Sequence, residues 1–269
     1  MSALSSRGIL AGAFLGFLLA AVPASAQCSA SSYSVALPHI AYGGGWQTTL
    51  LIRNTSSNSA TVTACYYGDD GSPLSVPFKG VGATSTTVTV SANGETEITP
   101  DSTGSATIAG WAGFSGGLPS GLSAQAVFVS SLGPTGFCIF SSPPNSVISN
   151  SPSQAVAPIV SGTGGTLSLP FDNTNGQVSG YAFANTSNQP VALTVTFFSE
   201  SGTGLGTYTL PSQLAAFGHT EFLLNASGLP AALANEKGVM EISGASVYPL
   251  GFRFAISGSS IQSFSTWLP

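Results

Sequence analysis

From Tyr33 onward, apolar residues recur at every second position, which is the period of a β-strand rather than of an α-helix. The alternation is clear in residues 46–53 (WQTTLLIR) and residues 61–67 (TVTACYY). Short polar turns such as Asn93-Gly94 separate these runs, because Asn and Gly tolerate the positive φ of a tight turn. The pattern predicts an all-β protein built from half-buried antiparallel strands.

The same pattern occurs twice. Residues 50–56 (LLIRNTS) correspond to residues 181–187 (YAFANTS), and Asn185 lies 131 residues after Asn54. Corresponding positions that we expect to be buried are apolar in both copies: Leu50/Tyr181, Ile52/Phe183, Ala64/Val195, Tyr66/Phe197, Phe114/Ile242 and Phe128/Phe254. Matching order and matching apolar positions predict two copies of one unit.

The segment between the copies, residues 141–165, is rich in Ser, Pro, Asn and Gly. We therefore predict two tandem Ig-like antiparallel β-sandwich domains, residues 27–150 and 151–269, with residues 154–160 able to form the first strand of the second. A short helical connection is expected in residues 228–238, where Pro230 suits a helix start and Gly238 a helix end.

Residues 1–26 have the composition of a cleaved signal peptide. Arg7 supplies a positive charge, residues 9–21 are apolar, and Ala24-Ser25-Ala26 fits the cleavage site. No later stretch is long and apolar enough to predict a membrane span. We expect a protein that is secreted or held at the cell surface, with the periplasm as a further possibility.

Charge is scarce in this chain, since only 6% of residues are charged. Removal of residues 1–26 takes away Arg7 and leaves four basic residues against ten acidic ones, a net charge of −6. Without a basic patch, nucleic acids and anionic membranes are poor partners. A cell-surface protein or a polysaccharide is the partner that we expect.

The three cysteines are Cys28, Cys65 and Cys138. An oxidising compartment permits one disulfide. Cys65 and Cys138 lie in strand-like segments of the first copy, and the second copy has Thr196 and Ser265 at the matching positions. We therefore expect a Cys65–Cys138 bond with Cys28 left over, although the spacing alone does not fix the pairing.

Candidate chemistry is sparse. The only histidines, His39 and His219, fall in different copies at positions that do not correspond, so we expect surface histidines and no metal centre or catalytic triad. A pocket that joins either histidine to two carboxylates would favour an enzyme instead. No catalytic, cofactor or metal residues are predicted.

Exposed aromatic rings are the main candidate for ligand contact. Trp46, Trp111 and Tyr67 could stack on sugar rings, and the alternation places Trp111 on the outer face of its sheet. The alternative is that these rings pack in the core or between the domains. The Asn-x-Ser sequences at Asn54 and Asn185 are expected to be turn residues without a glycan.

Residues 37–50 (LPHIAYGGGWQTTL), followed by Asn54 and by Gly110-Trp111-Ala112, resemble a class of uncharacterised secreted tandem β-sandwich repeat proteins of bacteria. The class has a P-H-x-A-x-G-G-G-W-x-T motif and a later G-W-A block. The second copy has Pro170-Phe171 at the place of the Pro-His motif and lacks the glycine run. The resemblance implies architecture and an extracellular location, without catalytic residues.

These observations favour a non-enzymatic secreted module with a structural or adhesive role at the bacterial cell surface. Sheet edges offer a way to recruit a partner strand. The alternative function is a carbohydrate-binding module that uses exposed aromatic side chains.

Overall fold

The computed structural model of the chain describes residue 28 and residues 31–102, 104–130, 153–161, 166–244, 246–257 and 260–267. Regular structure in these residues consists of antiparallel β-strands and a 3-10 turn, so the expected all-β class is confirmed. In the described part of the chain, no helix has the length and apolar character needed to cross a membrane. The predicted signal peptide, residues 1–26, lies outside the described residues.

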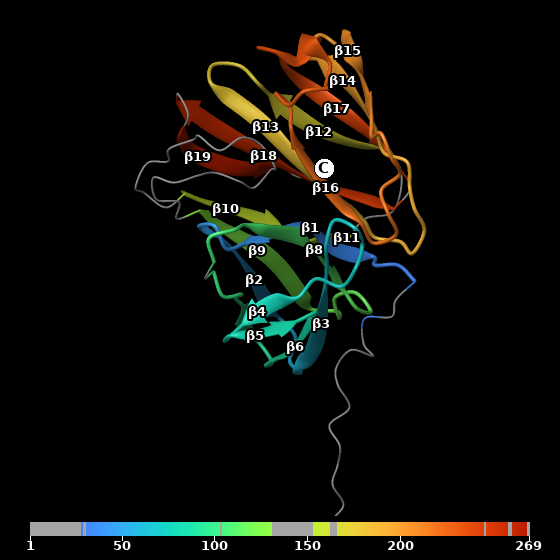
Figure 1. Cartoon of the computed structure of the whole chain (residues 1–269). Helices are drawn as coiled ribbons and strands as arrows, with labels where there is room; N and C mark the ends of the chain where they lie inside the picture. The colour runs from blue at the N-terminus through green and yellow to red at the C-terminus, as the bar shows by residue number, and fades with distance from the viewer. Residues whose placement is uncertain are drawn as a thin grey trace, which may run out of the picture.

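Two sheets form the first half of the molecule, which is the lower half in Figure 1. Sheet I has the order β11-β1-β8-β3-β6, and sheet II has the order β10-β9-β2-β7. Their strands are β1 (Val35–Tyr42), β2 (Trp46–Asn54), β3 (Ala60–Tyr67), β6 (Ser85–Val90), β7 (Glu95–Ile98), β8 (Ile108–Phe114), β9 (Leu122–Ser130), β10 (Ser153–Pro158) and β11 (Val160–Ser161). A separate ribbon pairs β4 (Val76–Phe78) with β5 (Val81–Ala83).

The second half also has two sheets. Sheet III has the order β12-β17-β14-β15, and sheet IV has the order β16-β13-β18-β19. Their strands are β12 (Leu167–Asp172), β13 (Gln177–Asn185), β14 (Thr194–Ser199), β15 (Gly204–Thr209), β16 (His219–Leu223), β17 (Lys237–Ser243), β18 (Val247–Ser257) and β19 (Ser260–Trp267). The helical connection expected in residues 228–238 is a single 3-10 turn, η2 (Ala231–Leu233).

The two halves have the same strand order. When β1, β2, β3, β6, β7, β8, β9 and β10 are matched with β12–β19 in sequence, the pairings of sheets I and II reappear in sheets III and IV. Two glycines agree as well. A Cβ added to Gly110 would lie 2.2 Å from the carbonyl oxygen of Tyr67, and one added to Gly238 would lie 1.9 Å from that of Phe198. These carbonyls are themselves 131 residues apart. Both glycines are therefore required by the close approach of a neighbouring strand.

The strand order differs from that of an immunoglobulin domain. In the immunoglobulin order, ABED on one sheet and CFG on the other, the first two strands lie side by side. Here β1 pairs with β8, and β2 lies in the opposite sheet between β9 and β7. The antiparallel sandwich is as expected, whereas its Ig-like order is not.

The expected boundary at Ser151 removes two strands from the sheets that they complete. β10 pairs with β9 along its whole length, and β11 pairs with the start of β1. Residues 154–160 therefore belong to the first half, and the prediction that they begin the second is wrong. Sheet edges accept any strand of the right length and pattern, so the composition of residues 141–165 did not reveal which half these strands join.

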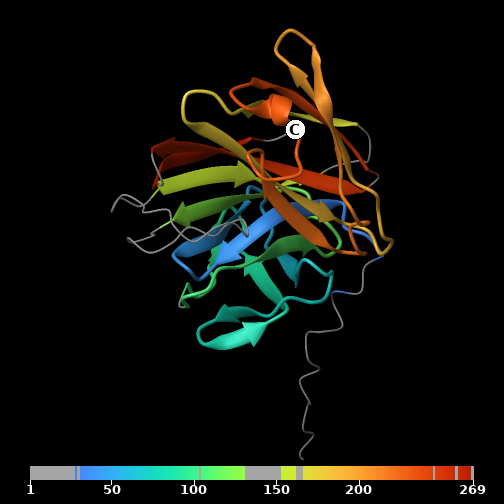
Figure 2. The same ribbon diagram turned by 45° about the horizontal axis from the view of Figure 1, so that its top comes forward.

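Sheet IV packs against sheet I, and its edge strand β19 lies beside β10 of sheet II; both contacts join the halves (Figures 1 and 2). All eight residues of β1 are buried, because one face of the strand meets its own sandwich and the other meets β13 and β18. On β18, Leu250, Phe252 and Phe254 belong to the same hydrophobic cluster as the core of the first half. The second half keeps a further core of its own around Tyr181 and Phe197.

Five of the six expected core pairs are buried as predicted, and the sixth is buried on the opposite face. In sheet II, Leu50 pairs with Ala126, whereas its counterpart Tyr181 pairs with Gly251. The counterpart of Phe128 is therefore Arg253, and Phe254 faces the first half. A shift of one residue turns every side chain of a strand to the other face, so this correspondence was wrong by one position.

Candidate functional site

A buried polar cluster joins the two halves. His39 Nδ1 lies 3.2 Å from His219 Nε2, and the other nitrogen of His219, Nδ1, lies 2.8 Å from Asp69 Oδ1 and 3.1 Å from Glu221 Oε2. His39 is 0% exposed and His219 is 2% exposed. We refer to His39, Asp69, His219 and Glu221 as the junction cluster.

Three segments from the two halves position these side chains. His39 lies on β1, His219 and Glu221 lie on β16, and Asp69 lies in the loop after β3. His219 and Glu221 point to the same face of β16 because side chains alternate along a strand. On the adjacent strand β13, their register partners are Ala184 and Ala182, whose small side chains leave room for the first half.

Aromatic rings surround His39. Its imidazole stacks on His219 at a centroid distance of 5.3 Å and on Phe128 at 6.1 Å, and it meets the edge or face of Phe252 at 5.6 Å. This apolar setting is costly for a charged ring. Burial, followed by the proximity of His219, lowers the pKa of His39 well below its ordinary value.

The carboxyl group of Glu221 is strongly affected by the same environment. Burial raises the pKa of Glu221 to about 7, and the negative charge of Asp69 acts in the same direction, while His219 acts against both. The carboxylates differ in exposure: the side chain of Asp69 is 65% exposed and that of Glu221 only 10%. The junction cluster therefore runs from the solvent at Asp69 into the interior at His39.

The expectation of two separate surface histidines is wrong. The residues come from different halves and do not correspond in sequence, and the packing of sheet IV on sheet I brings them together. A buried position for His39 is consistent with the strand pattern of residues 35–42. No sequence signal, however, identifies a partner 180 residues away that is reached through tertiary packing.

A scan of protein-family models finds no match, and a search of curated proteins finds none either. Among solved structures, a chain described as "Structure of infectious bursal disease virus Gx strain" aligns with 88% of this chain. The sequence identity is 12% and the TM-score 0.17, and the alignment covers 56% of the viral chain's length. A similarity of this size carries no argument about fold or function.

The three predicted sugar-stacking residues are buried. Trp46, Trp111 and Tyr67 are 1%, 0% and 5% exposed. Trp111 does lie on the outer face of sheet I, as the alternation predicts, but the second half covers it: its Nε1 donates a hydrogen bond to the carbonyl oxygen of Phe217 at 2.7 Å. Tyr67 stacks on Trp111 and on Phe217. Trp111 and Tyr67 belong to the packing between the halves, whereas Trp46 lies in the core of the first half, so none of the three rings offers a face to a sugar.

The disulfide joins Cys28 to Cys65 rather than Cys65 to Cys138. Cys138 lies outside the described residues. Cys65 is buried on the outer face of sheet I, in the cluster that contains Tyr67 and Trp111. Tyr33 and Cys28 also pack in this cluster, which brings Cys28 to Cys65. The bond ties Cys28, which precedes β1, to β3 beside the junction between the halves.

Asn54 and Asn185 are structural residues, as expected from their turns. Both are buried, at 1% and 0% exposure, and the amide of each donates to a backbone carbonyl four residues ahead. The Oδ1 atom of each accepts hydrogen bonds from the backbone and hydroxyl of the serine two residues later. Because the side-chain amide already donates these hydrogen bonds, a glycan at either residue would require the turn to open.

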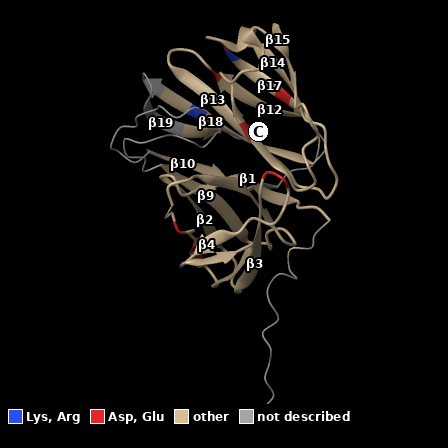
Figure 3. Cartoon of the chain, in the orientation of Figure 1, with Lys and Arg blue, Asp and Glu red and all other residues tan. Residues whose placement is uncertain are grey.

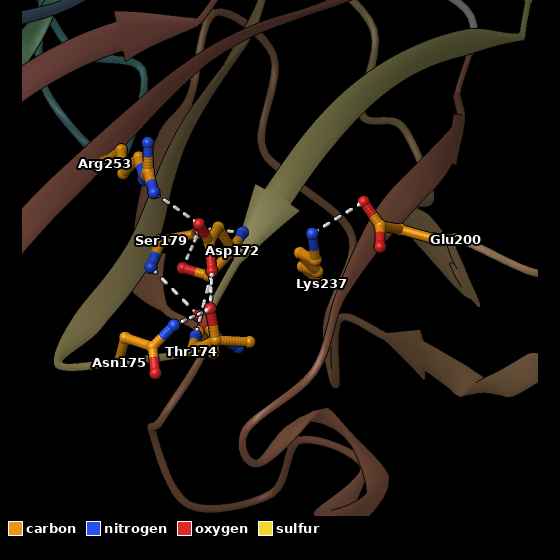
Figure 4. A network of polar contacts seen from close by, with 8 residues as sticks. Asp172, Thr174, Asn175, Ser179, Glu200, Lys237 and Arg253 are labelled. Atoms are coloured by element: carbon orange, nitrogen blue, oxygen red, sulfur yellow. Dashed lines mark hydrogen bonds and ion pairs between the residues drawn. The ribbon is translucent and has the colours of Figure 1, made fainter.

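A cavity of about 320 Å³ lies at the far end of the second half. Its polar lining includes the carboxamides Asn173, Gln177, Asn225 and Asn235, and its apolar lining includes leucines from the loop that contains η2. Figure 4 shows the network beside it, in which Asp172 accepts hydrogen bonds from the backbone and hydroxyl of Thr174 and pairs with Arg253. Asn173 is held by the backbone of Ser179 and Leu233.

Charged residues are few, and Figure 3 shows that their positions are scattered over both halves. Apart from the contacts of His219, the salt bridges of the described residues are Lys237–Glu200 and Arg253–Asp172. Both of these lie in the second half. The junction cluster is thus the place where ionisable groups from the two halves meet.

Proposed function

We propose that this chain is an exported, non-enzymatic β-sandwich module with a structural or adhesive role at a bacterial cell surface. The observation that carries the proposal is the way the halves are joined: sheet IV covers sheet I, and Leu250, Phe252 and Phe254 extend the core of the first half. A shared core resists the separation of domains, which suits a protein exposed to shear or to proteases outside the cell.

Three further observations support an extracellular location. The Cys28–Cys65 bond requires an oxidising compartment to persist. Ser, Thr, Asn and Gly supply most of the polar positions in a chain of which only 6% is charged. Residues 1–26 have the pattern that export requires.

We also infer that the module arose by duplication of one sandwich unit. The common strand order and the matching glycines Gly110 and Gly238 support this origin. The residues buried at the junction differ between the copies because the first copy contributes the outer face of sheet I and the second copy contributes the outer face of sheet IV.

The junction cluster does not favour catalysis, although His219 meets two carboxylates. A general acid or base must reach the substrate. His39 and His219 are buried between the sheets, and the exposed member, Asp69, is a loop carboxylate. We therefore interpret the cluster as part of the joint between the halves.

Localisation and adhesion can be tested together. The full-length chain with a C-terminal epitope is expressed in a bacterial host, and intact cells are treated with protease before fractionation. We expect an epitope that is cleaved on intact cells, a mature protein that begins near Gln27, and purified protein that competes with cell attachment to a surface. Retention of an unprocessed chain inside the cell, or no effect on attachment, would contradict the proposal.

Carbohydrate binding is a second candidate, now on a different basis. The carboxamides that line the 320 Å³ cavity can donate hydrogen bonds to hydroxyl groups and accept them. A neutral hydroxylated ligand therefore fits this cavity better than a charged one. On a glycan array, substitution of both Gln177 and Asn225 by Ala should abolish any signal, whereas the exposed Asn58→Ala should retain it. Absence of a signal for the unsubstituted protein removes this candidate.

A further inference from the structure

We propose that His39, His219 and Glu221 form a binding site for a divalent transition metal ion, with zinc as the preferred ion, and that the ion joins the two halves. One ligand atom from each of these residues lies within 4.8 Å of the other two. The ligands come from both copies, so a bound ion would connect β1 to β16.

The spacing of the imidazole nitrogens suits this metal. Two nitrogen ligands at about 2.0–2.1 Å from a tetrahedral zinc ion lie about 3.3 Å apart. His39 Nδ1 and His219 Nε2 are 3.2 Å apart. A carboxylate oxygen of Glu221 lies within 4.8 Å of a ring nitrogen of each histidine. In this structure it contacts His219 at Nδ1, so it must turn toward Nε2 to become the third ligand.

Asp69 has the position of a supporting carboxylate. When His219 Nε2 binds the ion, its Nδ1–H points at Asp69 Oδ1 at 2.8 Å. A carboxylate that accepts the second ring N–H of a ligand histidine fixes the orientation of the ring and raises its basicity. Asp69 is also 65% exposed, so it marks the side from which an ion reaches the buried nitrogens.

The balance of charge points in the same direction. Asp69 and Glu221 both direct their carboxylates at one buried imidazole, and their described salt bridges both end on His219. A buried carboxyl group is either protonated or, when it is ionised, paired with a cation. An ion of charge +2 offsets both carboxylates. Imidazole nitrogen with carboxylate oxygen is a ligand set that suits zinc, while calcium and magnesium require a shell of oxygens.

The chain is convenient for a direct test because His39 and His219 are its only histidines. Untagged mature protein, residues 27–269, is freed of metal with a chelator and titrated with ZnCl2 by calorimetry. We expect one zinc ion per chain, a shift of both imidazole NMR signals, and a rise in Tm of about 5–10 °C at a hundredfold excess over Kd. MgCl2 should give no such rise.

Variants separate ligands from neighbours. His39→Gln, His219→Gln and Glu221→Gln should each lose stoichiometric binding, and Asp69→Asn should bind about 10–100-fold more weakly. Asp70→Asn is the matched control, since Asp70 is adjacent, exposed, and bonded only within its own turn to Ser72. If the His39 variant does not fold, the Glu221 and Asp69 variants decide the question. Folded protein without stoichiometric binding, or Glu221→Gln with undiminished affinity, would overturn the proposal.

Discussion

Substitution of Phe252 by Ala is the most direct probe of the shared core. Phe252 lies on β18 in the second half, is 0% exposed, and packs on Phe128 of the first half at a ring distance of 5.2 Å. It also contacts His39 and Phe254. Removal of the ring leaves a cavity that lies between the halves rather than within one of them.

The expected cost follows from the loss of a fully buried ring. Phe→Ala substitutions in protein cores reduce the free energy of unfolding by about 3–5 kcal/mol. For a protein of this size, each kcal/mol lowers Tm by about 2–4 °C. Phe252→Ala should therefore lower Tm by about 6–20 °C, and the first half should lose stability together with the second.

Two of the three tryptophans, the buried Trp46 and Trp111, lie in the first half, and the third, Trp267, ends β19 in the second. In a Trp267→Phe background, tryptophan fluorescence therefore reports on the first half. Thermal unfolding followed by fluorescence and by calorimetry should show one transition that shifts as a whole in Phe252→Ala. Val239→Ala, at a 41% exposed position of β17, serves as the control and should change Tm by less than about 2 °C. A fluorescence transition that stays at its original temperature would show that the first half folds alone, and the reasoning would be refuted.

Three further substitutions test other contacts. Gly71→Ala should be far more destabilising than its control, Gly80→Ala. Both glycines have φ near +79°, but only at Gly71 would an added Cβ meet a backbone atom, the oxygen of Ala216 in the other half at 1.9 Å. A difference in Tm between the two variants below about 4 °C would contradict this packing. Cys28→Ser should cost about 2–4 kcal/mol of stability by denaturant unfolding, and reduction of the unsubstituted protein should give the same loss. Burial acts to raise the pKa of Asp172, but hydrogen bonds from Thr174 and the charge of Arg253 outweigh it and leave that pKa below 3.8. Folding thus favours the ionised form of Asp172. The unsubstituted protein should therefore have a free energy of unfolding about 1 kcal/mol higher than Asp172→Asn at pH 7, and this difference should persist above pH 4 and disappear as the pH falls below it. An advantage that is the same at pH 3 and pH 7 would exclude an ionic contribution.

The strands and their inward faces could be predicted because a period of two is a local property of the sequence. Leu50, Ile52 and Ala64 are buried as the alternation indicates, and so are their counterparts in the second copy. The turn at Asn93-Gly94 was also correctly placed, since Asn93 adopts φ +52°. Local patterns such as these need no knowledge of what lies on the other side of a sheet.

The candidate site could not be predicted because it depends on what covers an outer face. Alternation placed Trp111 away from its own sandwich, and this is where it lies, but the pattern is the same whether water or another sheet covers the ring. His39 and His219 meet for the same reason. The disulfide was missed because residue 28 precedes the first strand, and no periodic pattern there indicates which face the chain crosses.

The junction also accounts for the differences between the two copies. The face of β13 that meets the first half carries Gly180, Ala182 and Ala184, which admit a neighbouring sheet. The matching positions of β2 are Thr49, Leu51 and Arg53, and Arg53 is exposed.

The outer face of sheet I, on the other side of the junction, differs from the outer face of sheet III in the same way. Sheet I carries Gly113 beneath the ring of Tyr33, where an added Cβ would come within 2.6 Å of the ring, and the matching position in sheet III is the exposed Glu241. A head-to-tail contact between like units can in principle repeat without limit. In such a repeat the Arg53 face of one chain would meet the Glu241 face of the next, without the small residues that the existing junction uses. The bulk of these side chains and the loss of water around both charges therefore oppose the addition of a further copy, and the faces that they occupy are suited to solvent.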